Sequence, residues 1–144
     1  MRIVRVATVV LMMLSSSAVL AQAVSHSVKA SFDSAKEDLL LAIQGKGLVI
    51  DYTSHIGAML ERTGRDVGSA KKIFDKAEAY VFCSALVSRR VMEANPANVA
   101  YCPYGITLHT LPGQPGTVHV SYRRTLPEVD ALLAAIVQDA FNVK

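Results

Sequence analysis

The chain has 144 residues, of which 15 are basic and 12 are acidic, so its formal net charge is +3 at pH 7. Two of the basic residues, Arg2 and Arg5, lie in the first 23 residues, which contain no acid, so residues 24–144 carry 13 basic and 12 acidic side chains and a net charge of +1. Such a segment lacks the positive field that binds nucleic acid, and we expect no nucleic-acid partner.

Residues 1–23 have the pattern of a cleaved signal peptide. A cationic start is followed by an apolar stretch that is shorter than the roughly 20 residues that span a bilayer. The sequence Ala21-Gln22-Ala23 matches the small-residue pattern of a cleavage site, so we expect cleavage after Ala23. The alternative is an uncleaved anchor helix. Cleavage predicts a periplasmic or secreted protein with no membrane insertion.

The remaining residues, 24–144, are long enough for one domain with its own core, and their apolar spacing predicts strands and helices in turn. Most of the predicted strands alternate between apolar and polar residues, whereas two are buried strands of mostly apolar residues. In the predicted helices the apolar residues recur with a 3.6-residue period. The predicted order is strand 24–30, helix 31–47, strand 48–52, helix 56–64, strand 77–83, helix 84–96, strand 104–111, strand 117–124 and helix 125–142. The expected fold is an α+β two-layer sandwich, with helices over one mixed sheet. Because one sheet face or edge would stay uncovered, we expect a homodimer.

Several short sequence motifs resemble those of a known family. They are "FCSA", "SR", "NP" and "CPY" within residues 77–110, followed by "PGTVHVSYRR". In this order and spacing they are similar to the exported members of the family called domain of unknown function 302. The opening helix, strand and helix of residues 31–60 are similar to that family as well. The resemblance implies a compact α/β sandwich that is often dimeric. It carries over no established reaction, and it leaves the cofactor unknown.

Cys83 ends one predicted strand, and His55 follows another. If each strand–helix–strand unit is a right-handed crossover, the two strands are parallel and their ends lie at the same edge of the sheet. A helix that begins after Cys83 would lower the pKa of its thiol, and Arg89 would add positive charge. We therefore expect His55, Cys83 and Arg89 to form a ligand site. The alternative is that Cys83 is a small buried residue and His55 a helix cap.

Cys102 begins the strand after that helix. Parallel strands would place it roughly 20 Å from Cys83, whereas a disulfide needs Cα atoms within about 7 Å. A disulfide becomes possible if the two strands are antiparallel or if it joins two subunits, and an oxidising compartment favours one. Otherwise Cys102 faces a pocket as a further ligand-binding residue, and a metal thiolate is possible there.

His109 and His119 lie on two strands joined by the loop 112–116. If Leu111 pairs with Thr117, the two imidazoles are directly opposite each other, on the face that Arg123 shares. Two histidines at this spacing can bind Zn or Cu. Arg123 opposes a bound cation, and a solvated polar face is the alternative.

These observations lead to three hypotheses about function. The first is an exported binding module that holds a small ligand, a metal or a sulfur species near His55 and Cys83. The second is a structural or interaction protein whose cysteines stabilise it. The third is a thiol-dependent enzyme in which Cys83 is the nucleophile, although no third, orienting residue can be identified.

Overall fold

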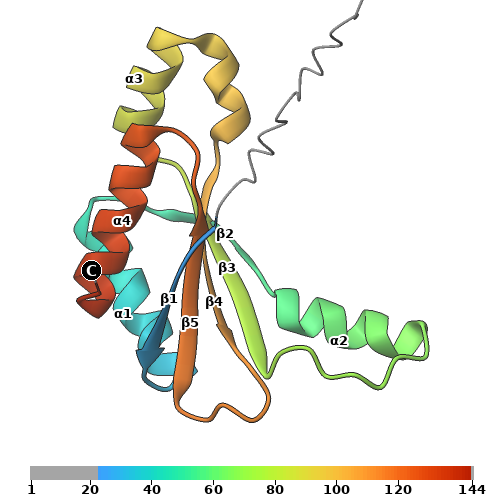
Figure 1. Ribbon diagram of the computed structural model, residues 1–144. Coiled ribbons are helices and arrows are strands. Elements are labelled where there is room, and N and C mark those ends of the chain that lie inside the picture. Colours follow the sequence, from blue (N-terminus) through green and yellow to red (C-terminus); the bar gives the residue numbers. More distant parts are fainter. Residues whose placement is uncertain (1–22, 144) are drawn as a thin grey trace, which may run out of the picture.

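The computed structural model describes residues 23–143, so all of the predicted signal peptide except Ala23 lies outside the described residues. Within these residues, four α-helices, a short 3-10 helix and five strands form the domain (Figure 1). They are β1 (Ala23–Lys29), α1 (Phe32–Gly45), β2 (Ile50–Ser54), α2 (Ile56–Asp66), β3 (Lys76–Phe82), α3 (Ala85–Ala94), η1 (Pro96–Tyr101), β4 (Tyr104–Thr110), β5 (Thr117–Arg123) and α4 (Pro127–Phe141). The predicted α+β class and the predicted order of strands and helices are confirmed.

The five strands form one sheet in the order β1-β5-β4-β3-β2, and every neighbouring pair is antiparallel. The parallel pairing that we expected for the strands before His55 and Cys83 is therefore wrong. Strands β2, β3 and β4 are neighbours that follow one another along the chain, so α2 and α3 are excursions within long hairpins rather than crossovers. A crossover to a parallel strand would have to carry its helix across the sheet.

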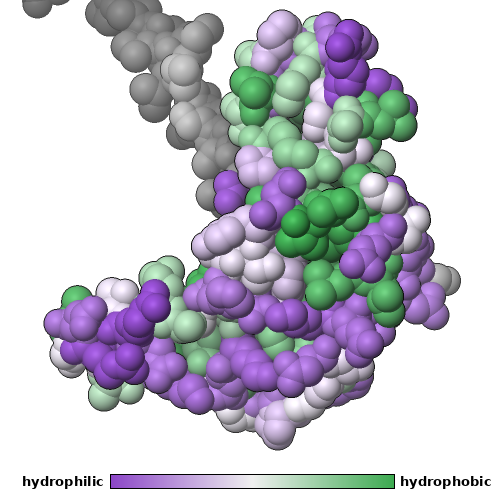
Figure 2. All heavy atoms as spheres, turned by 180° about the vertical axis from the view of Figure 1, so that it is seen from behind, coloured by the Kyte–Doolittle hydropathy of each residue, from purple (hydrophilic) through white to green (hydrophobic). Residues whose placement is uncertain are grey.

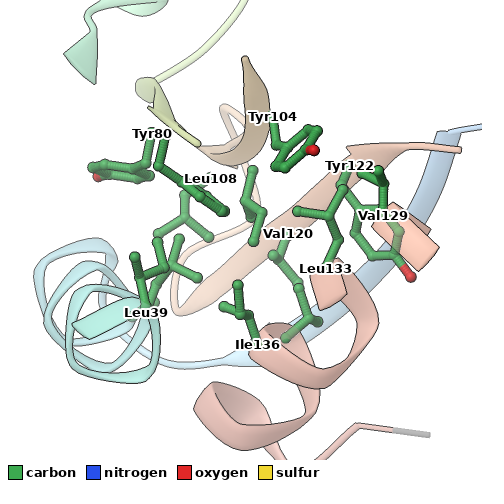
Figure 3. Close-up of a cluster of buried hydrophobic side chains, with 14 of the residues drawn as sticks. Leu39, Tyr80, Tyr104, Leu108, Val120, Tyr122, Val129, Leu133 and Ile136 are labelled. Atoms are coloured by element: carbon green, nitrogen blue, oxygen red, sulfur yellow. The ribbon is translucent and has the colours of Figure 1, made fainter. Parts of the chain in front are cut away.

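Helices α1 and α4 lie side by side on one face of the sheet and cover the core (Figure 1). In Figure 3, Leu39 of α1 and Leu133 and Ile136 of α4 point toward Leu108 and Val120 of the sheet. The alternation in β4 and β5 puts the buried side chains on this face, as the sequence predicts. These contacts join the first and the last helix of the domain into one layer.

Serine side chains cap two of the helices. Ser84 caps α3 by accepting a hydrogen bond from the Val87 N–H. Ser31 caps α1 by accepting one from the Ser34 N–H. Helix α4 begins at Pro127, and its cap residue Leu126 provides no side-chain hydrogen bond.

The opposite face of the sheet is largely free of helices. Helix α2 touches this side through the start of β3 and otherwise projects away from the domain (Figure 1). None of its residues is buried. No helix within residues 23–143 is long and apolar enough to cross a membrane.

Candidate functional site

A groove of about 680 Å³ lies over the face of the sheet that α1 and α4 leave uncovered and continues around the end of the sheet, where its lining includes Tyr104, Tyr122, Val129 and Leu133 of the covered side. Its floor is made of small side chains from three neighbouring strands, namely Ala79, Val81, Gly105, Thr107 and Ser121. These residues alternate with the core residues along each strand, so they point away from α1 and α4. Small side chains leave room above the sheet that a second molecule can fill.

The groove has walls at both ends. Ile56, the first residue of α2, stands at one end, and Tyr101 and Pro103 stand at the other. Arg123 and Arg124 also line it, and no Asp or Glu is found among its lining residues. Extending the β4–β5 register places Arg123 opposite Gly105, which has no side chain to obstruct it. The groove is therefore a positively charged hollow with a partly apolar floor.

Helix α2 contributes little apolar surface to the rear of the molecule. Figure 2 shows its rear side as mostly hydrophilic, while hydrophobic residues gather on the body of the domain. A second cavity, of about 370 Å³, lies between α2 and the segment 69–74. Leu60 and Phe74 are among its lining residues, together with Glu61, Arg65 and Lys72.

The structure places His55 and Cys83 at opposite ends of the β2–β3 pair. Ser54, just before His55, is opposite Ala79 of β3. Cys83 follows the end of β3, four residues after Ala79, which is a distance of roughly 14 Å along the strand. The two side chains therefore do not meet. Because β2 and β3 are antiparallel, the strand end that carries His55 is beside the beginning of β3.

His55 instead contacts Glu78. Its Nδ1 lies 3.2 Å from Glu78 Oε1, while Lys36 Nζ and the Tyr80 hydroxyl donate to Glu78 Oε2 at 2.8 and 2.6 Å. Burial by itself would raise the pKa of this carboxyl, which is only 17% exposed, but hydrogen bonds from Lys36, Tyr80 and His55 outweigh burial and lower its pKa. Burial and the neighbouring Glu78 raise the pKa of Tyr80, so it stays protonated.

Sequence reasoning missed Glu78, Lys36 and Tyr80. The available signal was a single acidic residue inside the otherwise apolar strand "AEAYVF". A carboxylate at such a position needs partners, because an unpaired buried charge is costly. It could have predicted a polar cluster, although not the identity of Lys36, which comes from α1.

Cys83 and Cys102 form a disulfide, with their Cα atoms 6.5 Å apart. The register pairs Phe82 with Tyr104, so both cysteines lie at the same end of the β3–β4 hairpin. The bond closes the base of the excursion that holds α3 and η1. Ser88 Oγ is 3.8 Å from the Cys102 sulfur and hydrogen-bonds the Tyr104 hydroxyl at 2.8 Å. Within residues 23–143 no cysteine is free.

Arg89 lies on the exposed side of α3 and pairs with Glu93, one turn further along the helix. It is not among the residues that line the groove. The structure therefore brings Cys83 and Cys102 together but places His55 and Arg89 elsewhere.

His109 and His119 are paired as predicted from the hairpin register, and their rings stack with centroids 4.9 Å apart. Ser27 Oγ lies 2.9 Å from Nδ1 of His119, and Gln114 Oε1 lies 3.1 Å from its Nε2. Burial and the nearby His119 lower the pKa of His109. Residues 23–143 contain no group of three or more His, Cys, Asp or Glu side chains that could hold a metal ion.

Comparisons with known proteins agree with this fold. A crystal structure of an uncharacterized conserved DUF302 protein from Bacillus stearothermophilus superposes with a TM-score of 0.61 and 13% identity, over 82% of this chain and 91% of that one. No curated protein matches the sequence. The model of the family described as "Domain of unknown function DUF302" matches residues 24–140. The chain therefore belongs to the DUF302 family.

Proposed function

We propose that this protein is an exported binding module that holds a small ligand in the groove over the open face of the sheet. The observation that carries the proposal is the groove itself, with its floor of small side chains. Its volume of about 680 Å³ falls in the range of ordinary ligand sites. None of the predicted ligand residues His55, Cys83, Arg89 and Cys102 lines the groove, although His55 precedes Ile56 and Cys102 precedes Pro103 in the sequence.

The disulfide supports a stabilising role for the cysteines. It joins Cys83 to Cys102 beside the wall formed by Tyr101 and Pro103. A protein that keeps such a bond fits an oxidising compartment, such as the periplasm or the outside of the cell. A thiol-dependent enzyme would need Cys83 reduced, and a disulfide sulfur is not a nucleophile. The binding module is therefore the better supported function.

Gly105 offers a direct test, because a Cβ there would meet only ordinary contacts, 3.8 Å from Tyr80 O and 4.0 Å from Val81 Cγ2. We expect Gly105→Leu to fold and to fill the groove. The neutral dye Nile red, which fluoresces in apolar sites, should bind wild-type protein and bind the variant at least tenfold more weakly.

Gly45→Leu is the matched control, since a Cβ at Gly45 meets nothing within 4 Å and lies outside the groove lining. Equal dye binding by wild type and Gly105→Leu would refute the proposed groove site. Loss of binding in the control as well would point to general misfolding rather than to the groove.

A second candidate function, an interaction protein that forms a homodimer, is favoured by α2. Helices of this length are marginal in water unless one face is packed. Yet α2 buries no residue: its Met59 is 44% exposed, and Val67, just after the helix, is 71% exposed. A second copy packed on this helix would supply the missing apolar contact.

Sedimentation of wild type, Met59→Asp and Leu41→Asp over a concentration series tests the dimer. We expect the charge at Met59 to dissociate the dimer, while the same change at Leu41 of α1, which is 59% exposed, leaves it intact. A monomer at every concentration would refute this second candidate and leave the groove untouched.

A further inference from the structure

We infer that the end of the groove formed by Arg123, Arg124 and Thr125 is a subsite for an oxyanion, so that the ligand carries a carboxylate or a similar group. The inference rests on the proposed function of the groove and specifies the class of ligand. It depends on three observations: unpaired arginines, a buried hydroxyl without a partner, and the open end of a long helix.

The first observation is that the two arginines lack acidic partners. Among the described residues, neither Arg123 nor Arg124 forms an ion pair, whereas Arg89, Arg90 and Arg65 each pair with a glutamate. No acidic side chain lines the groove to neutralise Arg123 and Arg124. An arginine fork matches the two oxygens of a carboxylate and can bind both.

Two acids lie close to this end of the groove, but both are engaged. Asp130 Oδ1 accepts a hydrogen bond from the Thr125 backbone N–H at 2.7 Å. Glu128 pairs with Arg90 of α3 at 3.0 Å. Neither carboxylate lies within ion-pair distance of Arg123 or Arg124, so the arginine side chains remain available to a ligand.

The second observation is the side chain of Thr125. Its Oγ1 is buried and has no hydrogen-bond partner within the described part of the chain, although Thr125 lines the groove. A buried hydroxyl is nearly always bonded in native proteins, so an unbonded one calls for an explanation. Because this oxygen is closed to solvent, the Thr125 side chain must rotate to turn it toward the groove, where an oxygen of a bound anion would accept its hydrogen bond.

The third observation is the beginning of α4. This 15-residue helix starts at Pro127, and its cap residue Leu126 provides no side-chain hydrogen bond. The first turn already contains two carboxylates, Glu128 and Asp130, which are engaged by Arg90 and by the Thr125 N–H, and the positive end of the helix dipole favours a further anion beside them. Val129 of this turn lines the groove, so the helix end lies at the same corner as the arginines.

The decisive experiment compares 2-naphthoate with its neutral analogue 2-naphthamide, titrated by calorimetry into the full exported protein. Two charge-assisted hydrogen bonds predict that wild type binds the acid about tenfold more tightly than the amide. In Arg123→Gln/Arg124→Gln this preference should disappear, while the affinity for the amide and for Nile red stays the same. Added salt should weaken only the binding of the acid.

Arg62→Gln/Arg65→Gln removes the same charge from α2 and serves as the matched control. Thr125→Val gives an independent readout, because it removes an unbonded hydroxyl and keeps the shape of the side chain. We expect its melting temperature not to fall, while its affinity for the acid drops about fivefold and that for the amide does not.

The outcomes separate the subsite from the groove. If wild type binds Nile red but shows no preference for the acid, or keeps the preference in Arg123→Gln/Arg124→Gln, the oxyanion subsite is refuted and the groove stands. If Gly105→Leu binds Nile red as tightly as wild type does, the proposed function of the groove is itself refuted. A preference lost equally in the α2 control would also refute the subsite, because net charge would then explain it.

Discussion

The two helical excursions of this domain are α2 between β2 and β3 and α3 between β3 and β4. They have the same topology but are stabilised in different ways. Each leaves the sheet and returns to the neighbouring antiparallel strand. The α3 excursion is closed at its base by the disulfide and buries Val87 and Val91. The α2 excursion has no covalent bond and buries none of its helical residues.

The root of the α2 excursion is held by polar and steric contacts instead. His55, its first residue, contacts Glu78, and Gly57 packs so closely on β3 that a Cβ would lie 2.9 Å from Ala77 N. We call the two excursions the α2 arm and the α3 arm. The comparison shows that a covalent bond stabilises the α3 arm, whereas reversible contacts alone hold the α2 arm. We therefore expect the α3 arm to be rigid and the α2 arm to open locally first.

Removal of the disulfide should have the largest effect. Closing a loop of this length, with a sequence separation of 19 residues, restricts the unfolded chain and stabilises the fold by about 3 kcal/mol. Cys83→Ala/Cys102→Ala should lose most of this free energy of unfolding in urea titrations. Hydrogen exchange should speed up first in α3 and η1.

The wild-type protein with reductant is the natural control, since it keeps both sulfur atoms but not the bond. Reduced wild type and the double variant should unfold at similar urea concentrations. An oxidised wild type no more stable than the variant would contradict the idea that the bond makes the two arms different.

Glu78→Gln should have the next largest effect, about 2 kcal/mol, because Lys36 and the Tyr80 hydroxyl would lose a charged hydrogen-bond acceptor that is only 17% exposed. The pKa of Glu78 is lowered in the fold, so its contribution is present above the ordinary value and is lost as the pH falls below it. The variant should lack this acid dependence. Urea titrations between pH 3 and 7 would measure both effects.

An exposed acid provides the comparison for Glu78. Asp33 pairs with Lys76 at 2.8 Å, in the same region but at a far more exposed position. Asp33→Asn should cost less than about 1 kcal/mol. If both variants cost the same, the cluster around Glu78 would not be what holds the root of the α2 arm.

Gly57→Ala should act on one arm alone. The added Cβ would clash with the backbone of Ala77, which cannot rotate away as a side chain does, so α2 must shift at a cost of about 1 kcal/mol. We expect faster hydrogen exchange and proteolysis in residues 56–75, with the α3 arm unchanged. Gly45→Ala, where nothing lies within 4 Å of the new Cβ, should be neutral or stabilising.

The fold was largely predictable because it follows from local patterns. Alternation in residues 117–124 and the 3.6-residue period of residues 125–142 gave the strand and the last helix, and the hairpin loop gave the His109–His119 register. The direction of each strand relative to its neighbour could not be predicted from local sequence patterns. Whether a helix that leaves a strand returns to a parallel or an antiparallel neighbour depends on packing across the whole sheet.

The error in strand direction accounts for most of what was missed at the site. Parallel strands would have placed His55 near Cys83 and Cys102 far from it. The antiparallel strands instead allow Cys83 and Cys102 to form a disulfide and place His55 in contact with Glu78. The groove residues also escaped notice, because small side chains such as Gly105 and Ala79 carry no chemical signal in a sequence. Their role depends on the absence of a helix above them.

The smallest effect is expected at His109, where the end of the α2 excursion returns to the sheet: its ring packs edge-on against Phe74, 5.2 Å away. Burial, followed by the charge of His119, lowers the pKa of His109, so the unfolded chain binds the proton more readily than the fold. Stability should therefore fall as the pH drops below about 6.5, the ordinary value for histidine. His109→Gln should remove this slope, and urea titrations from pH 7.5 to 5 would measure it. Because Phe74 belongs to the α2 excursion, acid should speed up hydrogen exchange there before it does so in the α3 arm, and equal changes in both arms would contradict the comparison.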